Sequence, residues 1–310
     1  MPSIISNQTY FRLASTVVTK KYSNTTKKVG ETYSEILNEI PADKRAFIQI
    51  QETTGMGVMS QMIDGQAPAL DSPKELNAFT ATFLKYGLGY EYTEDAEDDD
   101  APNFLAQCSS DLAYSRIVTE EQLYWNIFNQ AFNSGVTGTD GVALCNSAHP
   151  AAAAAGITQS NTASNLALAP ESLFSARLSF KALLDQRGLP ITRNPKWVLV
   201  PLELENTAGE ILGTDDYPYS DENRINMEAS KRNRIQVKAS RYLTSATAWF
   251  LLAGKGEPGT DCHGLFVSHK YKDRQKTWVE PKYSIFGHKA YFRSIWGFYT
   301  WYGTWGTQGS

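Results

Sequence analysis

Cysteine is scarce in this 310-residue sequence, and its three copies lie far apart. Cys108, Cys145 and Cys262 are too few and too scattered for a disulfide framework, so we expect reduced thiols and a cytosolic setting. No apolar run approaches the roughly 18 residues that span a bilayer, and the first residues hold no compact apolar block after a basic start. We therefore expect neither a membrane segment nor a secretory signal.

The common motifs of enzyme active sites are also missing. There is no GxSxG, no HExxH, no GxGxxG after a strand and no glycine-rich loop with a phosphate-binding lysine. Cys145 and His149 could be a thiol nucleophile and its base, but they lie four residues apart in a predicted hairpin without a family-type signature. Asp261–Gly264 with His269 could be part of a metal site, but no second pair has zinc-like spacing. We expect no catalytic residue, no metal and no cofactor.

Acidic residues are absent from the first 30 positions. Five cations occur there, at Arg12, Lys20, Lys21, Lys27 and Lys28. The whole-chain charge of −4 less this +5 leaves −9 on residues 31–310. A basic start that is rich in Ser, Thr and Asn predicts an extended arm. The arm is either a solvated tail or lies on an acidic neighbour or on nucleic acid, whereas the acidic body excludes a general DNA-binding protein.

Glycine is absent between Gly89 and Gly135, which favours a long helix. Thr93 is a plausible N-cap and Pro102 should interrupt the first turns. Helical spacing then relates Leu105, Cys108 and Leu112, followed by Leu123, Ile127 and Ala131. About 30 residues would form a rod on the order of 45 Å. The acidic run 97–100 could alternatively be a calcium loop, but it lacks the alternating ligand positions.

Residues 46–92 predict a long β-hairpin. The segments 46–53 and 78–93 are rich in β-branched and aromatic residues, and Phe79, Ala81 and Phe83 share one face of the second. Between them lies a loop that is rich in Gly, Met and Pro. Such a hairpin is poorly stable alone and needs a partner to lie on.

The second half of the chain predicts a mixed lobe. Pro170 and Gly188 bracket a helix whose buried stripe is Leu173, Ala176, Phe180 and Leu184. A buried strand follows at 196–201, then a short helix at 202–212. Further strands are expected at 233–243, 247–254, 264–269 and in the last 30 residues. The predicted fold class is therefore α+β.

A basic cluster follows the strand at 264–269. Lys270, Lys272, Arg274 and Lys276 are interleaved with Asp273. The pattern is typical of a solvated face, and an intersubunit contact patch is the alternative.

The final residues, GFYTWYGTWGTQGS, hold an unusual density of aromatic rings. Strand geometry would place Trp296, Phe298 and Tyr302 on one face, and Tyr299, Trp301 and Trp305 on the other. We expect one closing strand with both faces covered. One face would pack on Leu105, Leu112 or Ile127, and the other on the hairpin or a neighbouring subunit. A carbohydrate-stacking platform is the alternative.

The order of these features resembles the Hong Kong 97-type fold of tailed-phage major capsid proteins. The stretch FLKYGLGYEYTEDAEDDD resembles the return of the hairpin into the spine helix. DGVALCNSAHP is similar to the hairpin after the spine in Mu-like head subunits. GLPITRNPKWVLVPLELENTAGEIL and AWFLLA resemble the entry and a core strand of the axial lobe.

The resemblance implies five regions. These are an N-terminal arm (1–35), an extended hairpin loop (36–92), a peripheral lobe with the spine helix (93–195), an axial lobe (196–280) and closing strands of the peripheral lobe (281–310). It further implies subunit contacts through the arm, the hairpin and the aromatic tail. The candidate contact residues are Arg12, Lys20, Lys21, Lys27, Lys28, Phe79, Phe83, Lys85, Trp301 and Trp305.

The resemblance also implies partners and a location. The chain would form hexamers and pentamers of an icosahedral virion shell, assembled in the host cytoplasm around double-stranded DNA without sequence specificity. A portal protein would be a partner, with separate scaffolding, decoration or head-closure proteins as further candidates. No side chain pair marks a covalent crosslink. The same fold could instead build an encapsulin-like cellular compartment, and the aromatic tail leaves a glycan-binding module as a third hypothesis.

Overall fold

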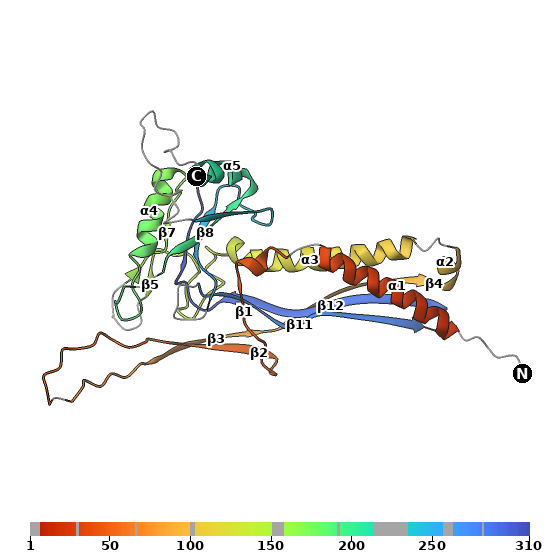
Figure 1. Ribbon diagram of the computed structural model, residues 1–310, viewed down its shortest axis with the longest axis horizontal. Helices are drawn as coiled ribbons and strands as arrows, with labels where there is room; N and C mark the ends of the chain where they lie inside the picture. The colour runs from red at the N-terminus through yellow and green to blue at the C-terminus, as the bar shows by residue number, and fades with distance from the viewer. Residues whose placement is uncertain are drawn as a thin grey trace, which may run out of the picture.

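Two β-sheets organise the chain, and its C-terminal residues contribute strands to both (Figure 1). The computed structural model describes residues 7–28, 31–65, 67–99, 103–150, 158–190, 193–213, 235–256, 263–280 and 282–310. The four-stranded sheet has the order β1 (Asn38–Glu39), β11 (Leu265–Glu280), β12 (Ile285–Phe298) and β4 (Leu84–Thr93). The five-stranded sheet has the order β7 (Thr162–Ala163), β13 (Thr304–Thr307), β10 (Trp249–Ala253), β8 (Pro195–Pro201) and β9 (Gln236–Ser240).

Two small sheets and the helices complete the fold, and the α+β class is confirmed. β2 (Phe47–Thr53) pairs with β3 (Glu75–Thr82), and β5 (His149–Pro150) with β6 (Thr158–Gln159). The α-helices are α1 (Asn7–Lys28), α2 (Glu94–Asp99), α3 (Asn103–Asn129), α4 (Pro170–Lys181) and α5 (Glu205–Gly213). The 3-10 helices η1 (Tyr33–Glu35) and η2 (Leu202–Leu204) are short connectors. None of these helices is both long and apolar enough to cross a membrane.

The predicted spine is α3, and α2 precedes it. The backbone N–H of Ala96 donates to Thr93 Oγ1, as expected for an N-cap. Leu112, Ile127 and Ala131 of the predicted stripe are buried. The acidic run is helical rather than a calcium loop as far as Asp99, while residues 100–102, with Pro102, lie outside the described part.

The arm is a helix, so the prediction of an extended arm is wrong. α1 packs along α3, where Ser109 Oγ donates to Val18 O at 2.7 Å. The Tyr22 hydroxyl donates to Asp273 Oδ1 at 3.2 Å, and its ring is fully buried. These partners lie far away in the sequence, and the tertiary contacts stabilise a helix that its local composition does not favour.

The predicted hairpin is shorter than expected, because its second half belongs to a different sheet. Only β3 pairs with β2, and β4 pairs with β12 from Leu84 to Thr93. Phe83 separates β3 from β4, with its side chain buried beside Ile48 and Phe266. Because this large ring is buried in the core, the chain leaves the hairpin at Phe83 and enters the four-stranded sheet.

The predicted lobe boundaries are also wrong at two places. The region 196–280 was expected to form one axial lobe, but β11 (265–280) pairs with β12 in the four-stranded sheet. The region 93–195 was expected to lie with the spine, but α4 packs on the five-stranded sheet, where Leu173 and Phe180 contact the cluster of Val198 and Val200. The helix prediction itself is confirmed, although Leu184 lies beyond its end at Lys181.

The aromatic tail completes both sheets instead of forming one strand. β12 ends at Phe298, and Gly303 has a φ of 80°, a left-handed conformation that allows the turn before β13. Phe298 joins the cluster that contains Ile127, whereas Tyr299 packs with Phe83 on the hairpin side, as predicted for the two faces. Trp301 and Trp305 depart from this prediction, because Trp301 joins the cluster of Phe298 and Trp305 packs in the core of the five-stranded sheet.

A buried histidine makes folding stability depend on pH. His263 Nε2 donates to Ile36 O at 2.7 Å, while His263 Nδ1 accepts from the Leu265 N–H at 3.2 Å. Acceptance at Nδ1 requires the neutral ring, and burial lowers the pKa of His263 from 6.5 to about 4. The unfolded chain therefore binds this proton first, and the stabilisation present above pH 6.5 is lost as the pH falls towards 4.

We expect a His263→Gln variant to remove this dependence. Between pH 6.5 and 4 the native chain should lose about 3 kcal/mol of unfolding free energy relative to the variant. Urea unfolding of the unassembled chain at several pH values measures the difference. A difference that stays constant across this range would contradict the assignment.

Candidate interaction surfaces

The outer side of α1 carries the described part of the basic arm. Lys20, Lys21 and Lys27 are exposed there, while Val18 and Tyr22 face the spine. The three lysines have no carboxylate partner among the described residues. The side chains of Arg12 and Lys28 lie outside the described part. This surface is therefore a cationic strip on a docked helix.

A projecting loop is the most apolar exposed part of the described chain. It connects β2 to β3 and extends away from both large sheets (Figure 1). Its exposed large side chains are Met56, Val58, Met59, Met62, Ile63 and Leu70. A set of this kind on one segment is typical of a surface that a partner covers.

Asp71 holds the base of this loop against the body. It accepts hydrogen bonds from the Gly57 N–H at 2.8 Å and from the guanidinium of Arg187. Arg187 Nη2 also donates to Ser72 O at 3.1 Å. The Gly57 N–H and Arg187 both lower the pKa of Asp71. This contact fixes the direction in which the loop leaves its subunit.

Phe79 and Phe83 do not lie on the outer surface of the hairpin. Phe83 is buried, and Phe79 is partly buried with its ring 5.6 Å from that of Phe266. Both residues fix the hairpin to the four-stranded sheet of their own chain. Their side chains therefore pack within their own chain, and not on an outer face as the predicted subunit contact requires.

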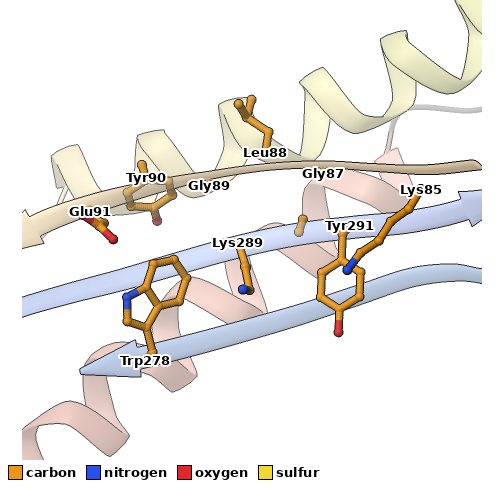
Figure 2. Close-up of a pocket in the computed structure, with 10 residues that line it drawn as sticks. Lys85, Gly87, Leu88, Gly89, Tyr90, Glu91, Trp278, Lys289 and Tyr291 are labelled. Atoms are coloured by element: carbon orange, nitrogen blue, oxygen red, sulfur yellow. The ribbon is translucent and has the colours of Figure 1, made fainter. Parts of the chain in front are cut away.

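Lys85 lies in a groove that the sequence did not reveal (Figure 2). The groove has a volume of about 610 Å³ and lies along β4, β12 and the end of β11. Strand register places Lys85 opposite Arg293, Gly87 opposite Tyr291, and Gly89 opposite Lys289. A Cβ at Gly89 would come within 2.8 Å of Lys289 Cβ, so the glycine permits close pairing and leaves the groove floor open.

Cations in the groove lie over aromatic rings. Lys85 Nζ is 4.5 Å from the centre of the Tyr291 ring, and Lys289 Nζ is 5.2 Å from that of Trp278. Figure 2 shows Lys85 extending beside Tyr291. The sequence contains a signal for this surface. Lys289, Tyr291 and Arg293 occupy every second position of β12, so two cations and an aromatic ring share one face of the strand.

The basic cluster of the sequence divides between the faces of β11, so a single solvated face is wrong. Lys272 Nζ lies 3.4 Å from Glu31 Oε2 on the helix side. Lys276 pairs in register with Lys289 and therefore shares the groove face. Arg274 also lies on this face, 4.3 Å from the centre of the Tyr271 ring. Lys270 instead donates to the carbonyls of Asp43 and Arg45.

Trp301 and Trp305 are core residues, so their predicted place at a subunit contact is wrong. Each is only 2% exposed within a single chain. Trp301 stacks on His149 with ring centroids 4.2 Å apart, and Trp305 lies 5.1 Å from Trp249. Neither ring is available to a sugar, which also removes the glycan platform.

The two fragments that suggested chemistry do not form sites in the described residues. His149 Nδ1 lies 2.6 Å from Asp140 Oδ2, and Nε2 lies 3.1 Å from Asn161 Oδ1, so neither nitrogen is directed at a nucleophile. Burial raises the pKa of the Cys145 thiol, which disfavours a thiolate. The described residues contain no group of three metal-ligating side chains, and Asp261 and Cys262 lie outside them.

Comparison with known proteins identifies relatives of the whole arrangement. Residues 77–302 match a family described as phage capsid protein. No curated protein sequence matches the chain. Solved structures that share the fold include the following three. The asymmetric unit of the bacteriophage PhiM1 mature capsid has a TM-score of 0.58 at 10% identity, covering 90% of this chain and 87% of its own. The bacteriophage JBD30 capsid has a TM-score of 0.57 at 13% identity, covering 70% and 92%. A virus-like particle from Pyrococcus furiosus has a TM-score of 0.52 at 8% identity, covering 94% and 98%.

Proposed function

Because the chain belongs to the phage capsid protein family and is a major capsid subunit of the Hong Kong 97-type fold, we propose that its projecting loop and docked arm link copies of it into an icosahedral shell. The location in the virion follows from the family. Assembly in the host cytoplasm, as hexamers and pentamers, is part of the proposal.

The exposed loop between β2 and β3 carries this proposal. Six large apolar side chains are exposed there, among them Met59 at 96% and Leu70 at 96%. Within a shell such a loop would lie on a neighbouring copy and bury this surface. Each subunit would then be held by several neighbours, so modest contacts would sum to a stable particle.

The charge distribution supports enclosed DNA without sequence specificity. The body carries −9, which limits phosphate contacts and leaves the genome free to be packaged. The lysines of α1 would contact an acidic neighbour or touch the genome lightly. Portal, scaffolding, decoration and head-closure proteins are further proposed partners. The role that we propose for this chain is structural, not enzymatic.

Electron microscopy of the purified full-length chain tests the proposal. We expect closed shells of regular size, and DNA inside particles that are isolated from infected cells. A monodisperse monomer or dimer under every assembly condition would count against it. Shells that carry an enzyme cargo and no DNA would instead support an encapsulin-like compartment.

A further inference from the structure

The groove beside β4 holds positive charge in fixed positions. Three cations lie over rings of the same face: Lys85 over Tyr291, Lys289 over Trp278, and Arg274 over Tyr271. Among the described residues, no carboxylate pairs with any of these three cations. A ring under each cation restricts its rotamers, so less side-chain entropy is lost when a ligand binds.

Within the described residues, the chain covers one end of this sheet face. The hairpin of β2 and β3 packs there, where Phe79 and Ile48 contact Phe266 and Ile295. Beyond Arg293 the face is open and carries the groove, with Trp278 and Tyr291 half-buried and Lys289 exposed. Trp, Tyr and Arg are the residue types that dominate protein interfaces. The composition therefore fits a protein contact.

The chain contains an acidic segment that complements this groove. In α2, every residue from Glu94 to Asp99 except Ala96 is acidic. No residue of α2 lines the groove of its own chain, and α2 leads into α3, whose Leu112 packs with Ala290 on the opposite face of the sheet. A second copy is the available source of this helix.

We propose that the groove lined by Lys85 and Lys289, with Arg274 on the same sheet face, binds helix α2 of a second copy of this chain. The inference rests on the proposed shell function and assigns one contact within it. Opposite charges on the two surfaces would set the register between neighbours and accelerate their encounter. Nucleic acid is the less suitable occupant, because a duplex needs phosphate contacts along an extended basic surface and the body of the chain carries −9.

Charge reversal on each side, and on both together, tests the contact. The groove variant is Arg274→Glu with Lys289→Glu, and the helix variant is Asp95→Lys with Asp99→Lys. Lys196→Glu is the matched control, since Lys196 is an exposed cation beside Trp197 in the other sheet. The shell fraction is measured by sedimentation and electron microscopy, and circular dichroism checks the folding of each variant.

We expect each reversed pair to lower the assembled fraction about tenfold, and the combined variant to recover much of it. The control should assemble like the native chain. High ionic strength should weaken assembly of the native chain more than that of the groove variant. Shells of native yield from both reversed pairs would overturn the inference while leaving the proposed function intact.

A binding measurement separates the groove from the rest of assembly. A labelled peptide of residues 93–100, TEDAEDDD, is titrated into the unassembled chain and followed by fluorescence anisotropy. Binding that falls about tenfold in the groove variant supports the contact, even if no condition yields shells and the proposed function fails. No groove-dependent binding of the peptide overturns it, as does groove-dependent binding of a short DNA duplex with no binding of the peptide.

Discussion

Replacement of Trp301 by alanine should cost about 3–5 kcal/mol of unfolding free energy, the largest effect that we expect from one substitution. The ring is 2% exposed, stacks on His149 with centroids 4.2 Å apart, and contacts the tilted ring of Tyr302 at 4.4 Å. Its removal leaves a cavity where α3 meets the loops beside β5 and the C-terminal tail. A loss of this size is a large fraction of the 5–15 kcal/mol that typically holds a protein folded.

Urea unfolding of the unassembled subunit measures this loss. Phe174→Ala is the control, because it removes an aromatic ring that is 52% exposed on α4 and should change the free energy by about 0.5 kcal/mol or less. Trp301→Phe should lie between the two. Equal losses for Trp301→Ala and Phe174→Ala would show that the tail is not part of the core.

Replacement of the loop residues 57–69 by a short glycine-rich turn should abolish closed shells and leave the subunit folded. The loop contributes little to its own chain, since its large apolar side chains are exposed and Asp71 and Arg187 tie down only its base. The unfolding free energy should therefore change by no more than about 1 kcal/mol. Electron microscopy and urea unfolding measure the two quantities.

A milder variant separates loop length from loop chemistry. Met59→Ser, Met62→Ser and Ile63→Ser together keep the length and remove apolar surface, and we expect them to reduce shell yield strongly as well. Arg187→Ala is the matched control outside the loop; it frees the base and should reduce yield less. Native yield from the serine variant would mean that the apolar side chains bury nothing in the shell.

Local signals in the sequence were sufficient for elements that depend on neighbouring residues. Thr93 and Pro102 marked the approach to α3, Pro170 marked the start of α4, and the apolar run after Pro195 marked β8. Each signal acts through the backbone of its own segment. The family resemblance then supplied the order of these elements and the fold.

Elements that depend on distant partners were mispredicted. α1 is basic and only sparsely apolar, and its helix depends on the contacts of Val18 and Tyr22 with α3 and β11. β4 pairs with β12, some 200 residues later, and no local pattern distinguishes this from pairing with β2. The groove could not be predicted for the same reason, because Lys85, Trp278 and Lys289 come together only through the register of three strands.

The placement of β11, β12 and β13 has a consequence for synthesis on the ribosome. Residues 265–307 provide central strands of one sheet and the partner of β10 in the other. A nascent chain that ends before residue 265 therefore lacks the two central strands of the four-stranded sheet and the partner of β10, although β8, β9 and β10, the apolar loop and the acidic helix are already made. Both sheets are therefore completed only after residues 265–307 have been made, which delays any finished contact face. The apolar loop is thus synthesised before the subunit has a finished surface on which another copy could pack.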